Sequence, residues 1–213
     1  MERHGFYKLF VSKNVDRLLA HFIKKLSELF IARRGCFSLA LAGGRTPLEA
    51  YKILSELSVK WDKVKVFLTD ERYVPYGDER SNCFNVRRFI KNIHCFDTSL
   101  PAEKAALLYS QKIEKVNGLD FVLLGLGKDG HTASLFPKTE CKEITPYVCI
   151  SKSPDGLLRL SLTERTISSF QRIAFFVKGQ EKRQILKKLL EGEDIPASRI
   201  KSKRKILILT DII

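Results

Sequence analysis

The stretch with the clearest chemical potential is residues 125–137, GLGKDGHTASLFP, in the middle of the chain. Its first six residues spell GxGxxG, a pattern with which dinucleotide-binding proteins bring their backbone against a pyrophosphate. It also places Asp129 two residues before His131, and histidine is the side chain best suited to proton transfer near neutral pH. The stretch therefore raises two possibilities, a cofactor loop or a loop that presents a catalytic histidine.

The residues around this loop argue against a dinucleotide. A dinucleotide-binding fingerprint needs a full helix after the glycines and an acidic residue about twenty positions later. Here Pro137 ends the following segment, TASLF, so we expect only a short helix over residues 132–136. The acid at a comparable distance, Asp155, lies in a turn-like SPDG and not at the end of a strand. We therefore expect no organic cofactor. Asp129 would either orient the imidazole of His131 or cap the short helix.

A second polar stretch, AGGRTP (residues 42–47), has the composition of a phosphate-binding turn. Gly43 and Gly44 allow backbone N–H groups to turn toward an anion, Thr46 adds a hydroxyl, and Arg45 adds charge. Pro47 suits the first turn of a helix with Thr46 as its N-cap, and the positive end of that helix dipole would face the same anion. A plain strand-to-helix turn explains this stretch equally well when it is taken alone.

Apolar spacing predicts helices and strands that alternate along the chain. We expect helices over residues 14–33, 47–54, 82–90, 101–116 and 180–190, with Ser81 as the N-cap of the third. We expect strands over residues 36–42, 64–69, 119–124, 147–151, 157–162, 173–177 and 205–209. Continuous apolar strands between amphipathic helices predict an α/β fold, a three-layer αβα sandwich with a mostly parallel, Rossmann-like sheet.

Three polar stretches follow predicted strands of this sheet: AGGRTP, DERYVP and GKDGHT. Ligands of such sheets bind beyond the carboxyl ends of the strands, near the point where the strand order reverses. We therefore expect the three stretches to form one site. Within DERYVP, the adjacent Asp70 and Glu71 point to opposite faces of an extended segment, so only one of them can face the cleft. We take Asp70 as that residue, in contact with sugar hydroxyls or with Arg72.

Length and composition predict one soluble domain over residues 1–213. The 213 residues, 44% of them hydrophobic, suffice for one sizeable core but not for two. MERHGFYKLFVSK lacks the apolar core of a secretory signal, and the apolar runs are too short to span a membrane, so we expect a cytoplasmic protein. The five cysteines are an odd number without the spacing of a zinc site, which predicts free thiols and no metal.

The net charge of +14 favours anionic partners, which include nucleic acid, a membrane surface and a phosphorylated metabolite. The basic residues are spread along the chain and are densest over residues 182–205. A spread of this kind is typical of a solvated surface, a smaller part of which can steer an anion. A basic nucleic-acid-binding protein is the alternative from another class, but no aromatic residues are interleaved with the charges, so we expect no nucleic acid as a partner.

Five segments in this order resemble the 6-phosphogluconolactonase family, which shares its fold with the glucosamine-6-phosphate deaminases. They are LALAGGRTPLEAYKIL, TDERYVPYGDERSNCFNVRR, FVLLGLGKDGHTASLFP, LRLSLT and FFVKGQEKRQIL, and together they extend from Leu39 to about Ile200. GxGxDGHTASLFP is the most specific of them. The chain departs from the family in two places. In the segment before Arg159, SPDGLLR replaces a proline-rich segment, and the C-terminal KILILTDII lacks tryptophan.

The resemblance implies hydrolysis of 6-phospho-D-glucono-1,5-lactone, a sugar-phosphate lactone, to 6-phosphogluconate in the oxidative pentose phosphate pathway. The related deaminases carry an acid shortly after the loop histidine, where this chain has Leu135 and Phe136, so the lactonase is the better match. A sugar-phosphate isomerase or deaminase of the same fold is the alternative. A lactone is an activated ester, so water needs one base and donors for the oxyanion, without a metal.

The resemblance also implies roles for individual residues. His131 would be the general base, and the phosphate would be bound by the loop from Gly43 to Thr46 with Arg72, Arg159 and Lys182. Arg159 interrupts an apolar strand, where an unpaired charge is costly, so it needs a partner, which could also be an acid. Asn82 and Asn85 could reach the sugar. The other histidines (His4, His21 and His94) have no polar neighbours that suggest chemistry. We expect a monomer or a homodimer.

Overall fold

The computed structural model of the protein describes residues 6–116 and 118–212, and its centre is a parallel sheet of seven strands. The strands lie in the order β1-β11-β10-β6-β2-β3-β5, and each pairs in parallel with its neighbours. Their bounds are β1 (Tyr7–Val11), β2 (Phe37–Leu41), β3 (Val64–Leu68), β5 (Ile93–His94), β6 (Phe121–Leu124), β10 (Arg172–Val177) and β11 (Ile206–Thr210). Every residue of β2, β6 and β11 is buried, as continuous apolar strands predict for a sheet covered on both faces.

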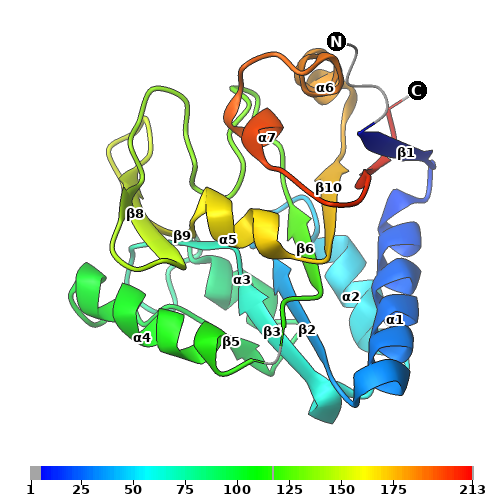
Figure 1. Ribbon diagram of the computed structural model, residues 1–213, viewed down its shortest axis with the longest axis horizontal. Helices are drawn as coiled ribbons and strands as arrows, with labels where there is room; N and C mark the ends of the chain where they lie inside the picture. Colours follow the sequence, from blue (N-terminus) through cyan, green and yellow to red (C-terminus); the bar gives the residue numbers. More distant parts are fainter. Residues whose placement is uncertain (1–5, 117, 213) are drawn as a thin grey trace.

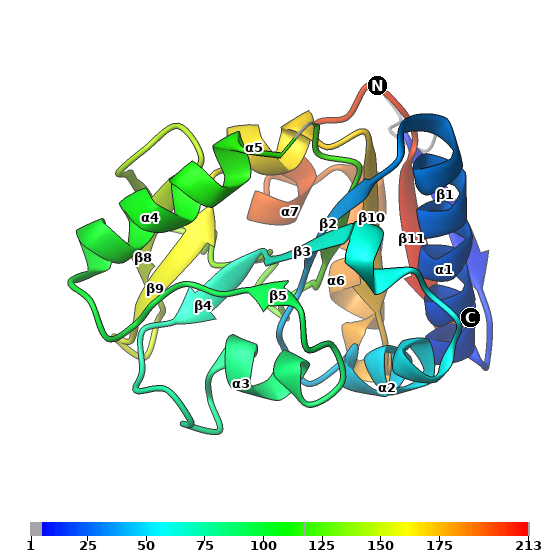
Figure 2. The same cartoon turned by 90° about the horizontal axis from the view of Figure 1, so that it is seen from below.

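Helices cover both faces of this sheet (Figures 1 and 2). α1 (Val15–Arg34) and α2 (Leu48–Glu56) pack against each other on one face, and α4 (Ala102–Glu114), α5 (Glu164–Ser169) and α7 (Pro196–Arg199) lie on the other. The remaining helices are α3 (Asn82–Arg87) and α6 (Arg183–Glu191), with 3-10 turns η2 (Trp61–Lys63) and η3 (Gln180–Lys182). The predicted three-layer αβα sandwich with a parallel sheet is confirmed.

A second, antiparallel sheet stands beside the first. Its strands lie in the order β4-β9-β8-β7, with β4 (Asp70–Arg72), β9 (Leu158–Leu162), β8 (Val148–Lys152) and β7 (Lys142–Glu143). β4 starts two residues after the end of β3, so the chain passes directly from one sheet into the other. The sequence predicted strands at β8 and β9 but did not assign them to a separate sheet. The register of this sheet sets Arg72 opposite Arg159.

Three local expectations differ from the structure. The strand β1 was not predicted, although it forms one edge of the parallel sheet and pairs with β11. The short helix over residues 132–136 is absent: Ala133 has a positive φ of 48°, and Thr132 forms a bridge with Leu135. α2 begins one residue after Pro47, which takes the N-cap position predicted for Thr46. The predicted cap of α3 is confirmed, since the Ser81 hydroxyl accepts a hydrogen bond from the Phe84 N–H.

The prediction of free cysteines is wrong for four of the five. Cys83 forms a disulfide with Cys95, and Cys141 forms one with Cys149, whereas Cys36 is free. Each disulfide joins segments that become neighbours only in the folded chain: α3 with the segment after β5, and the residue before β7 with β8. Within the described residues, no helix is long and apolar enough to cross a membrane.

Candidate active site

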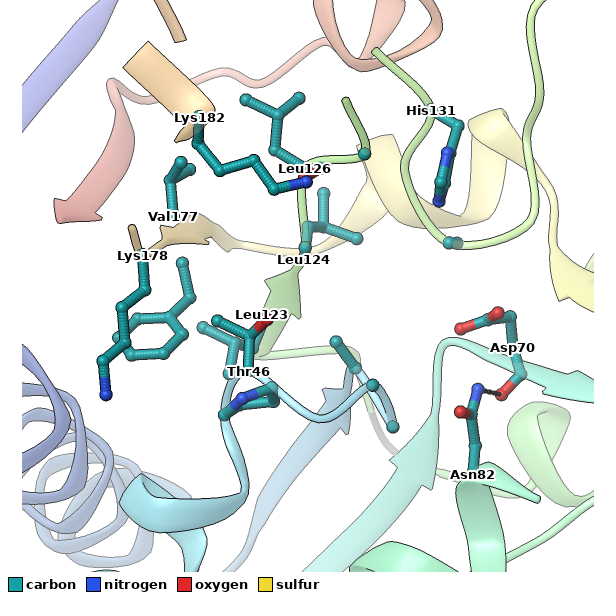
Figure 3. A pocket seen from close by; sticks show the side chains of 18 of the residues that line it. Thr46, Asp70, Asn82, Leu123, Leu124, Leu126, His131, Val177, Lys178 and Lys182 are labelled. Atoms are coloured by element: carbon teal, nitrogen blue, oxygen red, sulfur yellow. Dashed lines mark hydrogen bonds between the residues drawn. The ribbon is translucent and has the colours of Figure 1, made fainter. Parts of the chain in front are cut away.

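The three polar stretches meet at the carboxyl ends of the parallel strands, as expected. β2 and β6 are neighbours, and the chain continues from β2 toward β5 on one side and from β6 toward β11 on the other, so the strand order reverses between them. Gly43 and Gly44 follow β2, and the loop with His131 follows β6. Asp70 and Asn82 lie across the cavity from Lys182 and Lys178 (Figure 3).

The cavity between these stretches has two lobes. The first, the glycine lobe, has a volume of about 360 Å³ and includes Gly43, Gly44, Thr46 and Lys182 in its lining. The second, the arginine lobe, has a volume of about 440 Å³ and includes Ser153, Phe136 and Arg159. Both lobes share the lining residues Asp70, Arg72, Lys128, His131 and Ala133. His131 therefore stands where the two lobes join.

Asp129 holds the imidazole of His131. The carboxylate oxygen Oδ1 of Asp129 lies 2.5 Å from Nδ1 of His131 and accepts the His131 backbone N–H at 3.1 Å. Partial burial opposes ionisation of Asp129, but the hydrogen bonds and charge of His131 outweigh it, so the pKa of Asp129 is lowered. With Nδ1 engaged, Nε2 of His131 is the nitrogen left for the cavity, into which the ring projects (Figure 3). Because no helix follows, Asp129 orients the imidazole and caps nothing.

Glycines make room for this pair. A Cβ atom on Gly127 would lie 2.1 Å from Nδ1 of His131 and 2.6 Å from Oδ1 of Asp129, so any other residue would force the pair to move. Gly130 has a φ of 86°, in the left-handed region that favours glycine, and it sits against Ile195. Two glycines of the GxGxxG pattern thus shape the histidine loop.

Three hydrogen bonds fix the far side of the loop to the second sheet through Ser134. Its hydroxyl donates to Asp70 Oδ2 at 2.8 Å, and its backbone N–H donates to the Ser161 hydroxyl at 3.2 Å. Its carbonyl accepts from the Ser151 hydroxyl at 2.7 Å. Phe136 then packs its ring 4.9 Å from the imidazole of His131, so one side of the histidine is apolar.

Asp70 and Glu71 diverge as the alternation of a strand predicts. Asp70 is 8% exposed, lines both lobes and accepts hydrogen bonds from Thr69 and Ser134. Glu71 is buried behind it and accepts from the backbone N–H groups of Asn82 and Cys83, which secures the start of α3. Burial raises the pKa of Glu71. Asp70 does not hold Arg72, whose guanidinium instead donates to the Arg80 carbonyl at 2.5 Å.

The glycine-rich turn after β2 is shaped by a close contact. A Cβ on Gly43 would lie 2.2 Å from Cβ of Asn82, so Gly43 allows the turn to pack on α3. Asn82 donates from Nδ2 to the Asp70 carbonyl at 2.8 Å and also lines the glycine lobe. Thr46 lines the same lobe, whereas Arg45 is exposed and is not among the residues that line either lobe.

The two remaining predicted cations lie in different lobes. Lys182 lines the glycine lobe and donates from Nζ to the Leu126 carbonyl at 2.8 Å. Arg159 lines the arginine lobe, donates to the Ser153 hydroxyl at 3.2 Å and lies over the Phe136 ring. Burial lowers the pKa of both, and nearby positive charge from Lys128 and Arg72 respectively lowers them further. The hydrogen-bond partner of Arg159 is thus the Ser153 hydroxyl, and the charge of Asp155, which lines the same lobe, also favours the charged guanidinium.

Sequence reasoning missed several residues of the cavity. Lys128 and Lys178 line it, and Lys178 also pairs with Asp16. Lys128 lies inside the histidine loop and Lys178 directly follows a predicted strand, so position alone could have indicated both. Of the other histidines, His21 is exposed on α1 and His94 lies in β5, while His4 lies outside the described residues. No cluster of metal-binding side chains occurs among the residues that the structure describes.

Comparison with known proteins shows the family of the chain. The sequence matches the family described as glucosamine-6-phosphate isomerases/6-phosphogluconolactonase over residues 12–209. The chain belongs to this family. The match confirms the resemblance seen in the five motifs, and it includes both the histidine loop and the glycine-rich turn.

Individual members of the glucosamine-6-phosphate isomerase/6-phosphogluconolactonase family show the same likeness over nearly the whole chain. The chain is 33% identical over 201 residues to the 6-phosphogluconolactonase of Thermotoga maritima, across 90% of this chain and 91% of that protein. It is 33% identical over 223 residues to the 6-phosphogluconolactonase of a Nostoc species, across 94% and 90% of the two chains. The crystal structure of the Thermotoga maritima protein superposes with a TM-score of 0.86 at 31% identity, covering 96% of this chain and 98% of that one.

Proposed function

We propose that this protein hydrolyses 6-phospho-D-glucono-1,5-lactone to 6-phosphogluconate, with His131 as the general base. The reaction is supported by two relatives, from Thermotoga maritima and a Nostoc species, that are named 6-phosphogluconolactonase. The observation that supports the role of His131 is its contact with Asp129: Nδ1 is held at 2.5 Å, which directs Nε2 to the cavity. The reaction would be the second step of the oxidative pentose phosphate pathway, carried out by a single cytoplasmic domain.

In this mechanism Nε2 of His131 takes a proton from water as the water oxygen attacks the lactone carbonyl carbon. The C=O electron pair moves to oxygen and forms a tetrahedral oxyanion. When the carbonyl re-forms, the bond from that carbon to the ring oxygen breaks, and the imidazolium returns its proton to the leaving oxygen. The ionised Asp129 stabilises the imidazolium while it exists, which suits its lowered pKa.

The substrate phosphate would bind to the turn from Gly43 to Thr46 and to the cations of the two lobes. Arg72 lines both lobes, Lys182 lines the glycine lobe, and Arg159 lines the arginine lobe. Burial first and neighbouring positive charge second lower the pKa values of Lys182 and Arg159, and a bound phosphate dianion would favour the charged form of both. Arg45 would act only by long-range attraction, since it lies outside the lining.

Deamination of an amino-sugar phosphate is the alternative within the family, and the loop disfavours it. Leu135 and Phe136 occupy the positions where the deaminases carry an acid. Phe136 is buried against the His131 ring, so these two positions offer no carboxylate for ring opening.

A hydrolysis assay on fresh 6-phosphogluconolactone, corrected for spontaneous opening, tests the proposal, with glucosamine 6-phosphate as the comparison substrate. We expect His131→Ala to lower kcat on the order of 10²- to 10⁴-fold with little change in KM. His21→Ala, on the exposed face of α1, is the matched control and should retain full activity. A loss of less than about tenfold for His131→Ala would refute the general base.

Lys182→Ala and Arg159→Ala test which lobe holds the phosphate. Phosphate binding is shared by the ground state and the transition state, so loss of a phosphate ligand should raise KM and leave kcat nearly unchanged. A raised KM in both variants supports a phosphate that spans the two cations. An unchanged KM in either variant removes that residue from the phosphate site.

A further inference from the structure

A second cavity lies at the opposite end of the parallel strands from the candidate active site. It is a groove of about 670 Å³ between α1 and the strands β1 and β11, which lie side by side at one edge of the molecule (Figures 1 and 2). Arg172 opens β10 and lines this groove, whereas Lys178, just past the end of the same strand, lines the glycine lobe. The length of the strand thus separates the two sites, by about 17 to 20 Å.

The groove has an apolar floor and a basic rim. The floor is formed by Phe10, Phe22, Leu26, Leu29 and Leu207, which come from β1, α1 and β11. The rim is formed by Lys8, Lys25, Arg172, Arg204 and Lys205. None of the described residues that line it is acidic. We call this feature the basic groove.

Among the described residues, no acid pairs with the cations of the basic groove. Salt bridges within the described part of the chain involve none of its five cations. Glu28, which precedes Leu29 in α1, pairs with Lys24, and Asp120, whose carbonyl accepts from the Arg172 backbone N–H, pairs with Arg34. Burial lowers the pKa of Arg172, and the charges of Arg204 and Arg33 lower it further. Repulsion between these cations destabilises the free protein, and a bound anion would offset this repulsion.

We propose that the basic groove binds a nucleoside polyphosphate. The cations of the rim match several phosphate charges, and the volume is that of a small-molecule site. The apolar floor includes two phenylalanines, which suit the planar face of a base. A bare polyanion would use only the rim, so the floor distinguishes a nucleotide from inorganic phosphate chains. This inference does not depend on the proposed lactonase activity.

Calorimetric titration of the full chain with ATP tests the proposal, with inorganic tripolyphosphate as the matched anion. We expect one ATP to bind per chain, and to bind more tightly than tripolyphosphate. Arg204→Glu should weaken ATP binding on the order of tenfold or more. Lys203→Glu makes the same change of charge at the neighbouring exposed residue, which is not part of the groove, and should weaken binding less than about threefold.

A second pair of variants tests the floor. Phe10→Ser should weaken ATP binding and leave tripolyphosphate binding unchanged, whereas Leu9→Ser, at an exposed neighbour outside the groove, should alter neither. Saturating 6-phosphogluconate should not displace ATP, since the two sites are separate. Absence of ATP binding, equal affinity for ATP and tripolyphosphate, or equal effects of Arg204→Glu and Lys203→Glu would each overturn the proposal. Tighter binding of an oligonucleotide or of anionic vesicles, with the same sensitivity to Arg204→Glu, would replace the nucleotide with that partner.

Discussion

The hydroxyl of Ser134 donates a hydrogen bond to the carboxylate of Asp70 at 2.8 Å, across 64 positions of sequence. Ser134 belongs to the loop that carries His131, and Asp70 belongs to the first strand of the second sheet. The bond therefore sets the distance between the proposed base and the carboxylate on the facing wall of the cavity.

Ser134→Ala should remove the hydrogen bond between the histidine loop and Asp70 while both His131 and Asp70 are retained. The backbone bonds of position 134 to Ser151 and Ser161 are kept, and only the bond to Asp70 is lost, at a cost of about 2 kcal/mol in the free energy of unfolding. We expect kcat to fall on the order of tenfold because Asp70 is no longer held in one orientation. Ser55→Ala, which removes an exposed hydroxyl bonded within α2, is the control for steady-state kinetics and urea unfolding. Wild-type kcat in Ser134→Ala would contradict the positioning role.

Asp129→Asn should lower kcat about 10- to 100-fold with little change in KM, because the amide stabilises the imidazolium less than a carboxylate does. Stability should change with a defined sign. The pKa of Asp129 is lowered in the folded protein, so its stabilising contribution is present above the unfolded pKa of about 3.9 and is lost as pH falls through the folded value. Wild type should therefore exceed Asp129→Asn in stability at pH 6, and the gap should close in acid. A constant gap in urea unfolding between pH 6 and pH 2 would show that the carboxylate charge is not responsible.

Gly127→Ala should disrupt the pair of Asp129 and His131 although it removes no side chain from the cavity. The added Cβ would lie 2.1 Å from Nδ1 of His131, so the imidazole must move. We expect kcat to fall at least as far as in Asp129→Asn, together with a lower Tm. Gly125→Ala is the structural control, since no atom lies within 4 Å of its added Cβ, and its Tm should remain near that of wild type. Equal Tm values for the two variants would argue against the crowding at position 127.

The two disulfides predict a definite thiol count and a loss of stability on reduction. Alkylation of the unfolded, non-reduced protein should label one cysteine of the five, Cys36, and labelling after reduction should reach all five. The Cys83–Cys95 bridge closes a loop of 12 residues, so Cys95→Ser should lower the free energy of unfolding by about 3 kcal/mol. Cys36→Ser is the control and should change stability little. Five labelled thiols before reduction would exclude both bridges.

Much of the fold followed from local pattern. The continuous apolar strands at β2, β3, β6, β10 and β11 could be placed because a strand buried on both faces has no polar alternation. The edge strand β1 could not, since only part of its surface is buried and residues such as Leu9 and Val11 remain exposed. The short helix expected after Gly130 does not form, because hydrogen bonds from Ser134 to the second sheet hold this segment in a turn.

By itself the sequence determined the α/β class, the family, and the three polar stretches that follow strands, because these depend on periodicity and on motifs that are contiguous in the chain. Only the tertiary structure decided which side chains meet. It set Asp70 against Ser134, separated Arg159 from Lys182 into two lobes, left Arg45 outside, and paired four cysteines. These relationships join residues far apart in sequence or depend on how a loop turns, and no local propensity encodes them.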